Sequence, residues 1–327
     1  MNNSTLRLFK RSSVAACSIF FTGYFYSSTA LAASCCGGGA SGGVILPKFN
    51  QAMWDIGYSQ ESYEGYWDQQ GQHKSDPVGS DLNQISLNLS YAQRLNDDWQ
   101  VSGFVPLIHN QNQYSGEQSN VYGLGDSQVS LWYETFENVT CVYKINSWQS
   151  LKPAVYFGAS LTFPTGISNY GDRVSSSQDI TGRGFYRLDA NMLIEKTVYP
   201  FSVAWQASYG QHLERPINEE SGKAVNAYDK KLGDRTSHTI SAAYTWFLPS
   251  LAMLNATVSH GTLKEGKTTN DGITDSASGL EKQSLAFNLS YSSTVRDWIL
   301  KIGVSQAQTG QKIPKTTVTN IGISHVY

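Results

Sequence analysis

Residues 317–327, TVTNIGISHVY, decide the fold class, because apolar or aromatic side chains alternate there with small polar ones. The side chains of a β-strand point alternately to its two faces. One face of this stretch carries Thr319, Ile321, Ile323, His325 and Tyr327, and the other carries Asn320, Gly322 and Ser324. In lipid such a strand needs hydrogen-bonding partners on both sides, so it must close a barrel. A soluble β-protein whose edge strand ends on Tyr327 is the alternative that this stretch leaves open.

Eleven further stretches show the same alternation, most regularly residues 82–94, where Ile85, Leu87 and Leu89 share one face. Strands with an apolar and a polar face are typical of membrane barrels. The sequence therefore predicts an all-β fold, a transmembrane antiparallel β-barrel of about twelve strands over residues 51–327. The other ten expected strands are residues 52–60, 99–108, 126–136, 153–164, 185–195, 201–210, 237–247, 251–261, 283–291 and 298–305.

The connections between these stretches alternate in length. Those after the second, sixth, eighth and tenth strands are short, whereas those after the odd-numbered strands, the eleventh included, are long and polar. Outer-membrane barrels have short periplasmic turns and long external loops, and an even strand count places both termini in the periplasm. Residues 137–151 break the rule, because they are long where a short turn is expected. Residues 139–145, which include Cys141, could add a short strand pair.

Composition excludes a helical membrane protein. The chain has 29 Gly, 19 Tyr and 8 Trp among its 327 residues, and its mean hydropathy is -0.33. A transmembrane helix needs about 18 consecutive apolar residues, and no such run follows the N-terminal segment. Aromatic residues stand near the ends of the expected strands, where interfacial girdles would lie: Tyr91, Trp99, Tyr133, Trp246, Tyr291 and Trp298.

The N-terminus has the pattern of an export signal peptide, residues 1–32. Basic residues precede a short apolar core at 14–26, and Ala30-Leu31-Ala32 is a small-residue cleavage site. A retained membrane anchor is disfavoured because the core is short and interrupted by Thr22 and Gly23. Cleavage after Ala32 would leave 21 Lys and Arg against 26 Asp and Glu, a net charge of -5. No basic patch indicates a nucleic-acid partner.

Residues 33–50 form a glycine-rich lead segment that begins with the pair Cys35-Cys36. So much glycine disfavours regular structure, so we expect a flexible segment that could plug the lumen. The adjacent thiols could bind Cu(I) or zinc, act as a redox pair or form intermolecular disulfides, although two ligands are too few for a closed zinc site. A lipidation site is disfavoured because Leu31 is one residue too far from Cys35. With Cys141 the thiols are odd in number, so disulfides do not hold the fold together, and we expect no cofactor.

Three motifs resemble one outer-membrane family. They are Val105-Pro106-Leu107, Gly123-Leu124-Gly125-Asp126 and Thr162-Phe163-Pro164-Thr165-Gly166. Together they look like the "MetA-pathway of phenol degradation" transporters, which are similar to the long-chain fatty-acid transporter superfamily. The resemblance implies passive passage of a small, often hydrophobic or aromatic solute, with an N-terminal segment lodged in the lumen. Locally, the glycines let a loop bend into a strand, and Asp126 can accept hydrogen bonds from backbone N–H groups.

Residues 317–327 also resemble the C-terminal β-signal of bacterial outer-membrane proteins, through Asn320, Gly322 and the final Tyr327. They depart from that pattern at His325, where a second hydrophobic or aromatic residue is usual. We expect these residues to act as the barrel-assembly signal.

The size of the barrel and the alternation of lipid-facing and lumen-facing side chains along each strand identify candidate lumen residues. Eight strands leave room only for side chains and sixteen give an open channel, so about twelve should give a narrow lumen. The charged or aromatic side chains expected to face it could line a selective path or could pair with one another: Trp132, Glu134, Arg187, Asp189, Glu195 and Lys301.

Two other function classes were weighed. A barrel phospholipase needs a Ser activated by a His, but Ser259 and His260 are sequence neighbours that point to opposite faces of a strand, and His238 has no evident partner. An adhesin or receptor could act through the long loops at 61–81, 165–184, 211–236 and 262–281.

The sequence thus predicts a porin-like transport channel, not an enzyme, in the outer membrane of a Gram-negative bacterium. The expected partners are outer-membrane lipids, the barrel-assembly machinery and a small-molecule solute. The residues do not specify the solute, the direction of transport or the oligomeric state.

Overall fold

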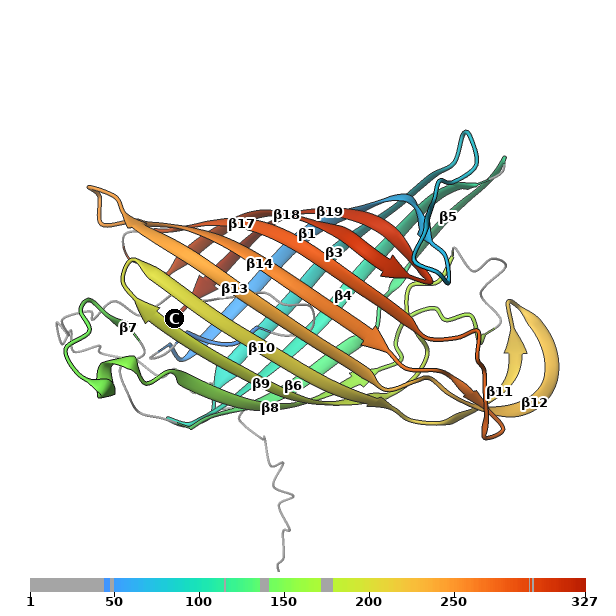
Figure 1. Cartoon of the computed structure of the whole chain (residues 1–327), viewed down its shortest axis with the longest axis horizontal. Coiled ribbons are helices and arrows are strands. Elements are labelled where there is room, and N and C mark those ends of the chain that lie inside the picture. Colours follow the sequence, from blue (N-terminus) through green and yellow to red (C-terminus); the bar gives the residue numbers. More distant parts are fainter. Residues whose placement is uncertain are drawn as a thin grey trace, which may run out of the picture. The chain divides into compact units, whose positions relative to one another are not determined.

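A computed structural model describes residues 44–47, 50–114, 116–135, 141–171, 179–293, 295 and 297–327, which all belong to one compact unit, Ala33–Tyr327. Twelve strands pair antiparallel with their neighbours in the chain, and the last pairs with the first, so the sheet closes into a barrel (Figure 1). The predicted all-β, twelve-stranded barrel is confirmed. Its strands are β1 (Ala52–Trp67), β3 (Asp81–Arg94), β4 (Trp99–Tyr114), β6 (Ser127–Glu134), β8 (Ala154–Phe163), β9 (Arg187–Val198), β10 (Phe201–His212), β13 (Arg235–Phe247), β14 (Met253–Glu265), β17 (Leu280–Ser292), β18 (Trp298–Gln311) and β19 (Ile313–Val326).

Closure depends on the pairing of β19 with β1. Ile323 lies opposite Ile56, and Val326 lies opposite Met53. Backbone hydrogen bonds complete the seam, because Ala52 N donates to Tyr327 O at 2.8 Å and Tyr327 N donates to Ala52 O at 3.0 Å. A closed sheet has no free edge, so all twelve strands have partners on both sides.

The two ends of the barrel differ. The short turns at 95–98, 199–200, 248–252 and 293–297 lie at the same end as Ala52 and Tyr327, which we call the terminal end. The opposite end, which we call the loop end, carries the longer connections. The prediction of a long loop between the last two strands was wrong, because β18 and β19 extend until only Lys312, with φ of 52°, separates them.

Residues 141–151 lie at the terminal end and do not add a strand pair. Cys141–Val142 forms a single short strand, β7, which pairs in parallel with Thr197 and Val198 of β9. A 3-10 helix, η1 (Trp148–Leu151), follows it. Among its described residues this connection therefore contributes one short strand, not a strand pair, and the barrel has twelve strands.

Strand structure continues at the loop end into segments that the sequence predicted as loops. There β5 (Glu117–Leu124) pairs with the outer part of β4, and β2 (His73–Lys74) pairs with β1. A separate four-stranded sheet contains β11 (Arg215–Glu220), β12 (Lys223–Lys231), β15 (Thr269–Asn270) and β16 (Ile273–Thr274). These segments carry too few apolar residues to show a regular alternation, although Ile217 of β11 is buried in a small cluster with Phe185 and Leu232.

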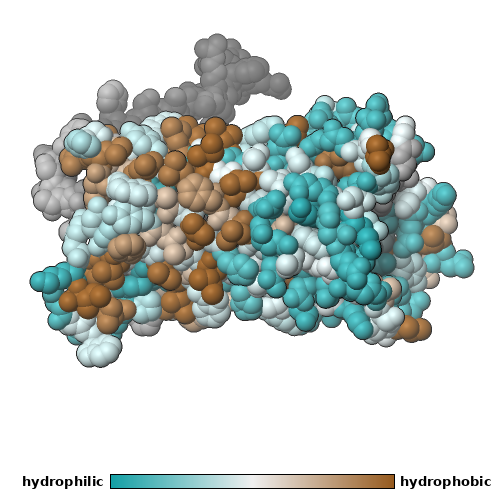
Figure 2. Space-filling model, turned by 45° about the horizontal axis from the view of Figure 1, so that its top comes forward, coloured by the Kyte–Doolittle hydropathy of each residue, from teal (hydrophilic) through white to brown (hydrophobic). Residues whose placement is uncertain are grey.

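On the face that Figure 2 shows, apolar residues gather near the terminal end, whereas the surface toward the loop end is mostly polar. Outward side chains that stay highly exposed include Leu188, Val203, Ile302 and Ile321, at 55–59% of their full accessibility. Such a band suits contact with hydrocarbon. None of the described helices is long or apolar enough to cross a bilayer.

Aromatic rings gather at the terminal end of this surface. His325 stacks on Trp54 with centroids 5.9 Å apart and lies edge-on to Trp298 at 4.6 Å. The imidazole therefore stands in an aromatic cluster, at the position where the β-signal pattern usually has a hydrophobic or aromatic residue.

The interior is largely polar. Hydroxyl and amide side chains of neighbouring strands bond across it, as in Ser130 to Ser160 at 2.8 Å and Asn191 to Ser160 at 2.8 Å. These bonds satisfy groups that face a confined space, so the wall of the lumen is a connected polar surface.

Candidate functional site

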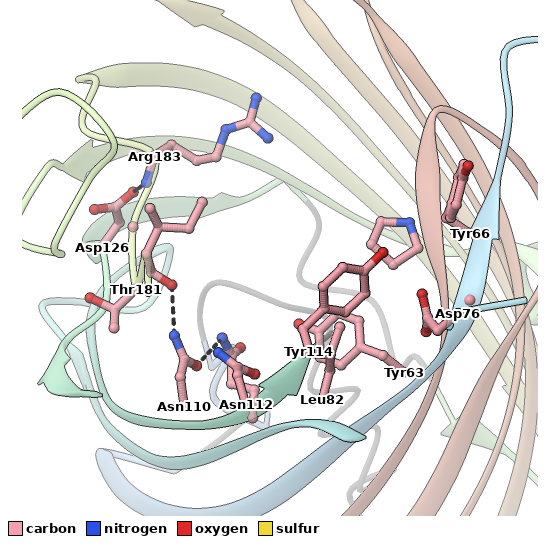
Figure 3. Close-up of a pocket in the computed structure, with 15 residues that line it drawn as sticks. Tyr63, Tyr66, Asp76, Leu82, Asn110, Asn112, Tyr114, Asp126, Thr181 and Arg183 are labelled. Atoms are coloured by element: carbon pink, nitrogen blue, oxygen red, sulfur yellow. Dashed lines mark hydrogen bonds between the residues drawn. The ribbon is translucent and has the colours of Figure 1, made fainter. Parts of the chain in front are cut away.

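A cavity of 610 Å³ lies in the lumen toward the loop end (Figure 3). Its lining comes from β1, β3, β4 and β19 and from the connections before β3, before β6 and between β8 and β9. It includes Tyr63 and Tyr66 of β1, Asp76, Gln84 of β3, Asn110, Asn112 and Tyr114 of β4, Asp126, residues 180–183 and Pro314. Figure 3 shows Asp126 and Thr181 on one side of the space and Tyr63 and Tyr114 on the other.

The three sequence motifs meet beside this cavity. Gly125 N donates to Pro106 O at 2.8 Å, and a Cβ at Gly125 would lie 2.7 Å from the Pro106 ring. Thr165 Oγ1 in turn donates to Gly125 O at 2.6 Å. Glycine is needed because the two segments approach too closely for any side chain. The motifs thus act as a structural clamp, as their residue types predicted.

Asp126 ties the β8–β9 connection to this clamp. Its carboxylate accepts backbone N–H groups of Gly166 at 3.1 Å and of Arg183 at 2.6 Å. Gly182 packs directly against the same carboxylate, and a Cβ there would lie 2.2 Å from it. Two charge-assisted hydrogen bonds therefore bend the connection inward, so that residues 180–183 form part of the cavity wall.

Asn110 joins the barrel wall to the same connection. Its side-chain oxygen accepts from Gln84 Nε2 at 2.8 Å, and its Nδ2 donates to Ile180 O at 2.9 Å. On the far side, the guanidinium of Arg183 pairs with Glu265 of β14. The inward segment is therefore held from two sides, which gives the cavity a fixed shape.

The terminal half of the lumen contains residues 44–47. Val44 and Leu46 are buried against Met53, Ala92, Ile299 and Val326, with Leu46 only 1% exposed. Leu46 N donates to the side-chain oxygen of Gln100 at 2.6 Å. This part of the N-terminal segment therefore packs on the inner faces of β1, β3, β18 and β19.

Ile45, between these two residues, packs on a second apolar cluster. That cluster contains Trp132, Tyr156 and Leu193 from β6, β8 and β9, which lie nearly opposite the first group in the strand order. Arg94 adds a polar anchor, since its Nε donates to Asn50 O at 3.1 Å. Residues 44–46 thus bridge two walls of the lumen.

The six predicted lumen residues all face the interior. Trp132, Glu134, Asp189 and Glu195 are buried, at 4–8% exposure, and none of the six lines the 610 Å³ cavity. The charged ones pair with neighbours: Arg187 with Asp189 at 2.8 Å, Glu134 with Arg94 at 3.7 Å, Lys301 with Asp55 at 2.6 Å, and Glu195 with the Tyr156 hydroxyl at 3.4 Å. These contacts fit the alternative that they pair within the interior, and a role in a solute path stays a prediction.

The Trp132 side chain packs over a glycine of the adjacent strand. Its indole lies over Gly158 of the neighbouring strand β8, where a Cβ would come within 2.6 Å of the ring. An aromatic side chain over a strand glycine covers backbone that would otherwise be bare. Trp132 belongs to the apolar cluster on which Ile45 packs.

The remaining sequence predictions fall in three groups. Asn320, Gly322 and Tyr327 lie on or next to β19, and their part in assembly stays a prediction.

Cys35 and Cys36 lie outside the described residues, and elsewhere in the described chain no cluster of three or more His, Cys, Asp or Glu could hold a metal. Ser259 is half-buried and His260 exposed, so these neighbours do lie on opposite faces of β14.

The cavity residues were missed by sequence reasoning. Tyr63, Asn112 and Tyr114 fall in segments predicted as loops, although Asn110, Asn112 and Tyr114 continue the two-residue period of β4. The run Val44-Ile45-Leu46 was likewise an apolar signal inside the glycine-rich segment. Both signals were present, and both were weaker than the alternation in the membrane strands.

Comparison with known proteins gives relatives by structure only. No family model and no curated protein matches the sequence. Among solved structures, the COG4313 outer membrane channel from Pseudomonas putida F1 matches with a TM-score of 0.67 at 13% identity, over 86% of this chain and 97% of that one. The chain has the fold of an outer-membrane channel.

Two further matches have TM-scores below 0.5. They are the beta domain of the Bordetella autotransporter BrkA (TM-score 0.49, 11% identity, 85% of this chain and 100% of that one) and the NanC porin (TM-score 0.45, 12% identity, 83% and 98%). The resemblance of residues 99–166 to phenol-pathway transporters stays a prediction.

Proposed function

We propose that this protein is an outer-membrane channel of a Gram-negative bacterium, through which a small solute passes by diffusion. In this arrangement the terminal end faces the periplasm and the loop end faces outward, as short turns and long loops do in bacterial barrels. The fold shared with a bacterial outer membrane channel supports the proposal.

The observation that carries the proposal is the contrast between the two surfaces of one closed sheet. The outer face is apolar near the terminal end, whereas the inner face is a polar wall that encloses a 610 Å³ cavity. A barrel stabilised only by packing would fill its interior with side chains. A polar interior with room for a small molecule suits a path for solutes.

The N-terminal segment regulates this path. Residues 44–46 bridge two apolar clusters in the terminal half of the lumen, where a hydrated solute would have to displace them. Docking of residues 44–46 therefore closes the periplasmic half of the lumen, and their release opens it.

The solute is small and contains a ring. The sequence resemblance taken alone implies a hydrophobic or aromatic compound, whereas the tyrosine rings at the cavity offer apolar contact to any ring, whether or not that ring carries polar groups.

Planar-bilayer recordings test the proposal with purified residues 33–327 and with a variant that lacks residues 33–50. We expect low or intermittent conductance from the first and steady conductance from the second, with matching solute flux in liposome-swelling assays. Folding of both proteins is checked by heat-dependent gel mobility and β-sheet circular dichroism. Neither conductance nor flux from two folded proteins would contradict a channel.

A further inference from the structure

The cavity at the loop end contains two kinds of polar group. Asp126, Asn110 and Arg183 are occupied in holding the β8–β9 connection or in pairing with Glu265. In contrast, no hydrogen bond or ion pair within the described part of the chain engages the hydroxyls of Tyr63 and Tyr114 or the carboxylate of Asp76. The first kind builds the cavity, and the second kind is available to a ligand.

The available groups disfavour a hydrocarbon. An apolar ligand would displace water from the hydroxyls of Tyr63 and Tyr114 and from Asp76 without replacing its hydrogen bonds. Leaving one such group unsatisfied typically lowers affinity by about 5- to 150-fold. A ligand with a single hydroxyl would satisfy only part of the set.

The charges of the lining disfavour an anion. Arg183 is the cationic residue among the described residues that line the cavity, and Glu265 already neutralises it. An anionic ligand would instead meet the unpaired carboxylate of Asp76, and like charges repel at such a site. An uncharged ligand encounters no such barrier.

Size and ring contacts narrow the class further. A volume of 610 Å³ lies within the range of about 300–1,000 Å³ typical of small-molecule sites. Tyr63 and Tyr114 stand on the same side of the space in Figure 3, and each offers a flat apolar ring beside its hydroxyl. A cyclic compound with several hydroxyls matches both features of these side chains.

We propose that this cavity is a binding site for uncharged sugars of one or two rings, which it holds before they enter the channel. The hydroxyls of Tyr63 and Tyr114 and the Asp76 carboxylate bond the sugar hydroxyls, while the tyrosine rings contact its C–H groups. This assignment rests on the proposed channel function, and it names a polar class of solute in place of the hydrophobic class that the sequence resemblance implies.

Isothermal titration calorimetry on the detergent-solubilised protein tests the site without relying on conductance. The probes are glucose and maltose, compared with phenol, toluene and gluconate. We expect measurable binding of at least one of the two sugars, and at least tenfold weaker binding of the other three compounds. Tyr63→Phe and Tyr114→Phe keep the rings and remove one hydroxyl each, so each should weaken sugar binding by about 2- to 12-fold.

Tyr58→Phe is the matched control, because Tyr58 is on the same strand, β1, and is 42% exposed outside the cavity lining. This variant should bind sugars like the parent. No sugar binding, unchanged sugar affinity in both cavity variants, or tighter binding of phenol or toluene than of sugars would overturn the assignment. A protein that conducts but binds no sugar disproves this inference alone, whereas a folded protein that binds sugars yet never conducts disproves the channel.

Discussion

Leu46→Ala should open the channel, because Leu46 is the most deeply buried part of the described plug. The side chain is 1% exposed and packs on Met53, Ala92, Ile299 and Val326. Truncation of a buried leucine typically costs about 2–5 kcal/mol. We take about 2 kcal/mol, since a short docked segment can shift to fill part of the space.

This cost favours the undocked state by about 30-fold, at roughly 1.4 kcal/mol for each factor of ten. A channel that is docked about 99% of the time would then be open about a quarter of the time. Single-channel recordings in planar bilayers measure this open fraction directly.

Leu95→Ala is the matched control for this experiment. It also truncates a leucine at the terminal end, but Leu95 is 57% exposed in a turn. We expect its open fraction to equal that of the parent. If Leu46→Ala and the variant lacking residues 33–50 both gate like the parent, the docked segment does not control the path and the reasoning from its burial fails.

Three further predictions concern the barrel wall. Asp126→Ala removes the acceptor of two backbone N–H groups, and at about 1–2 kcal/mol for each bond we expect the free energy of unfolding in urea to fall by about 2–4 kcal/mol. We also expect faster proteolysis between residues 164 and 186. An unchanged cleavage rate would contradict the clamp. Gly158→Val should cost about 1–3 kcal/mol because its side chain meets Trp132, and Trp132→Ala in the same chain should make the Gly158→Val change less costly, as a double-mutant cycle would measure. Lys301→Met removes the ammonium group that lies 2.6 Å from the Asp55 carboxylate, so it should lower the urea midpoint of unfolding. Adding Asp55→Asn should recover part of the loss, because no partly buried charge is then left without its counter-charge. Equal midpoints in the parent and in Lys301→Met would show that this ion pair contributes nothing to stability.

The membrane strands could be predicted because the bilayer imposes one rule on them. In β3, Leu87 and Leu89 must face hydrocarbon while Asn88 and Ser90 must face the lumen, so hydropathy itself reports the period of two. The same rule gave the inward direction of Arg187 and Lys301. It could not give their partners, since Asp55 is 246 residues from Lys301 in the chain and meets it only when the barrel closes.

Beyond the bilayer that rule no longer applies. The strands β5 and β12 carry only a few apolar residues and no regular apolar alternation, and their hydrogen bonds form because β4 and β11 lie alongside. The cavity depends on these extensions, because Tyr63 and Tyr114 stand where β1 and β4 continue past the apolar band. The candidate site could thus not be predicted from the sequence, for the same reason as the strand extensions that form it.

The two halves of the lumen call for different physical solutions, and the residues differ accordingly. A seal must exclude water, so the terminal half uses the apolar side chains of residues 44–46 between two apolar clusters, where docking gains free energy from burial. A site that receives solutes must exchange water for ligand at little cost, so the loop half keeps hydroxyl and carboxylate groups that are bonded to nothing else in the described chain. A solute bound at Tyr63 and Tyr114 does not touch Leu46, so binding and opening should be separable: a variant at either place should leave the other property unchanged.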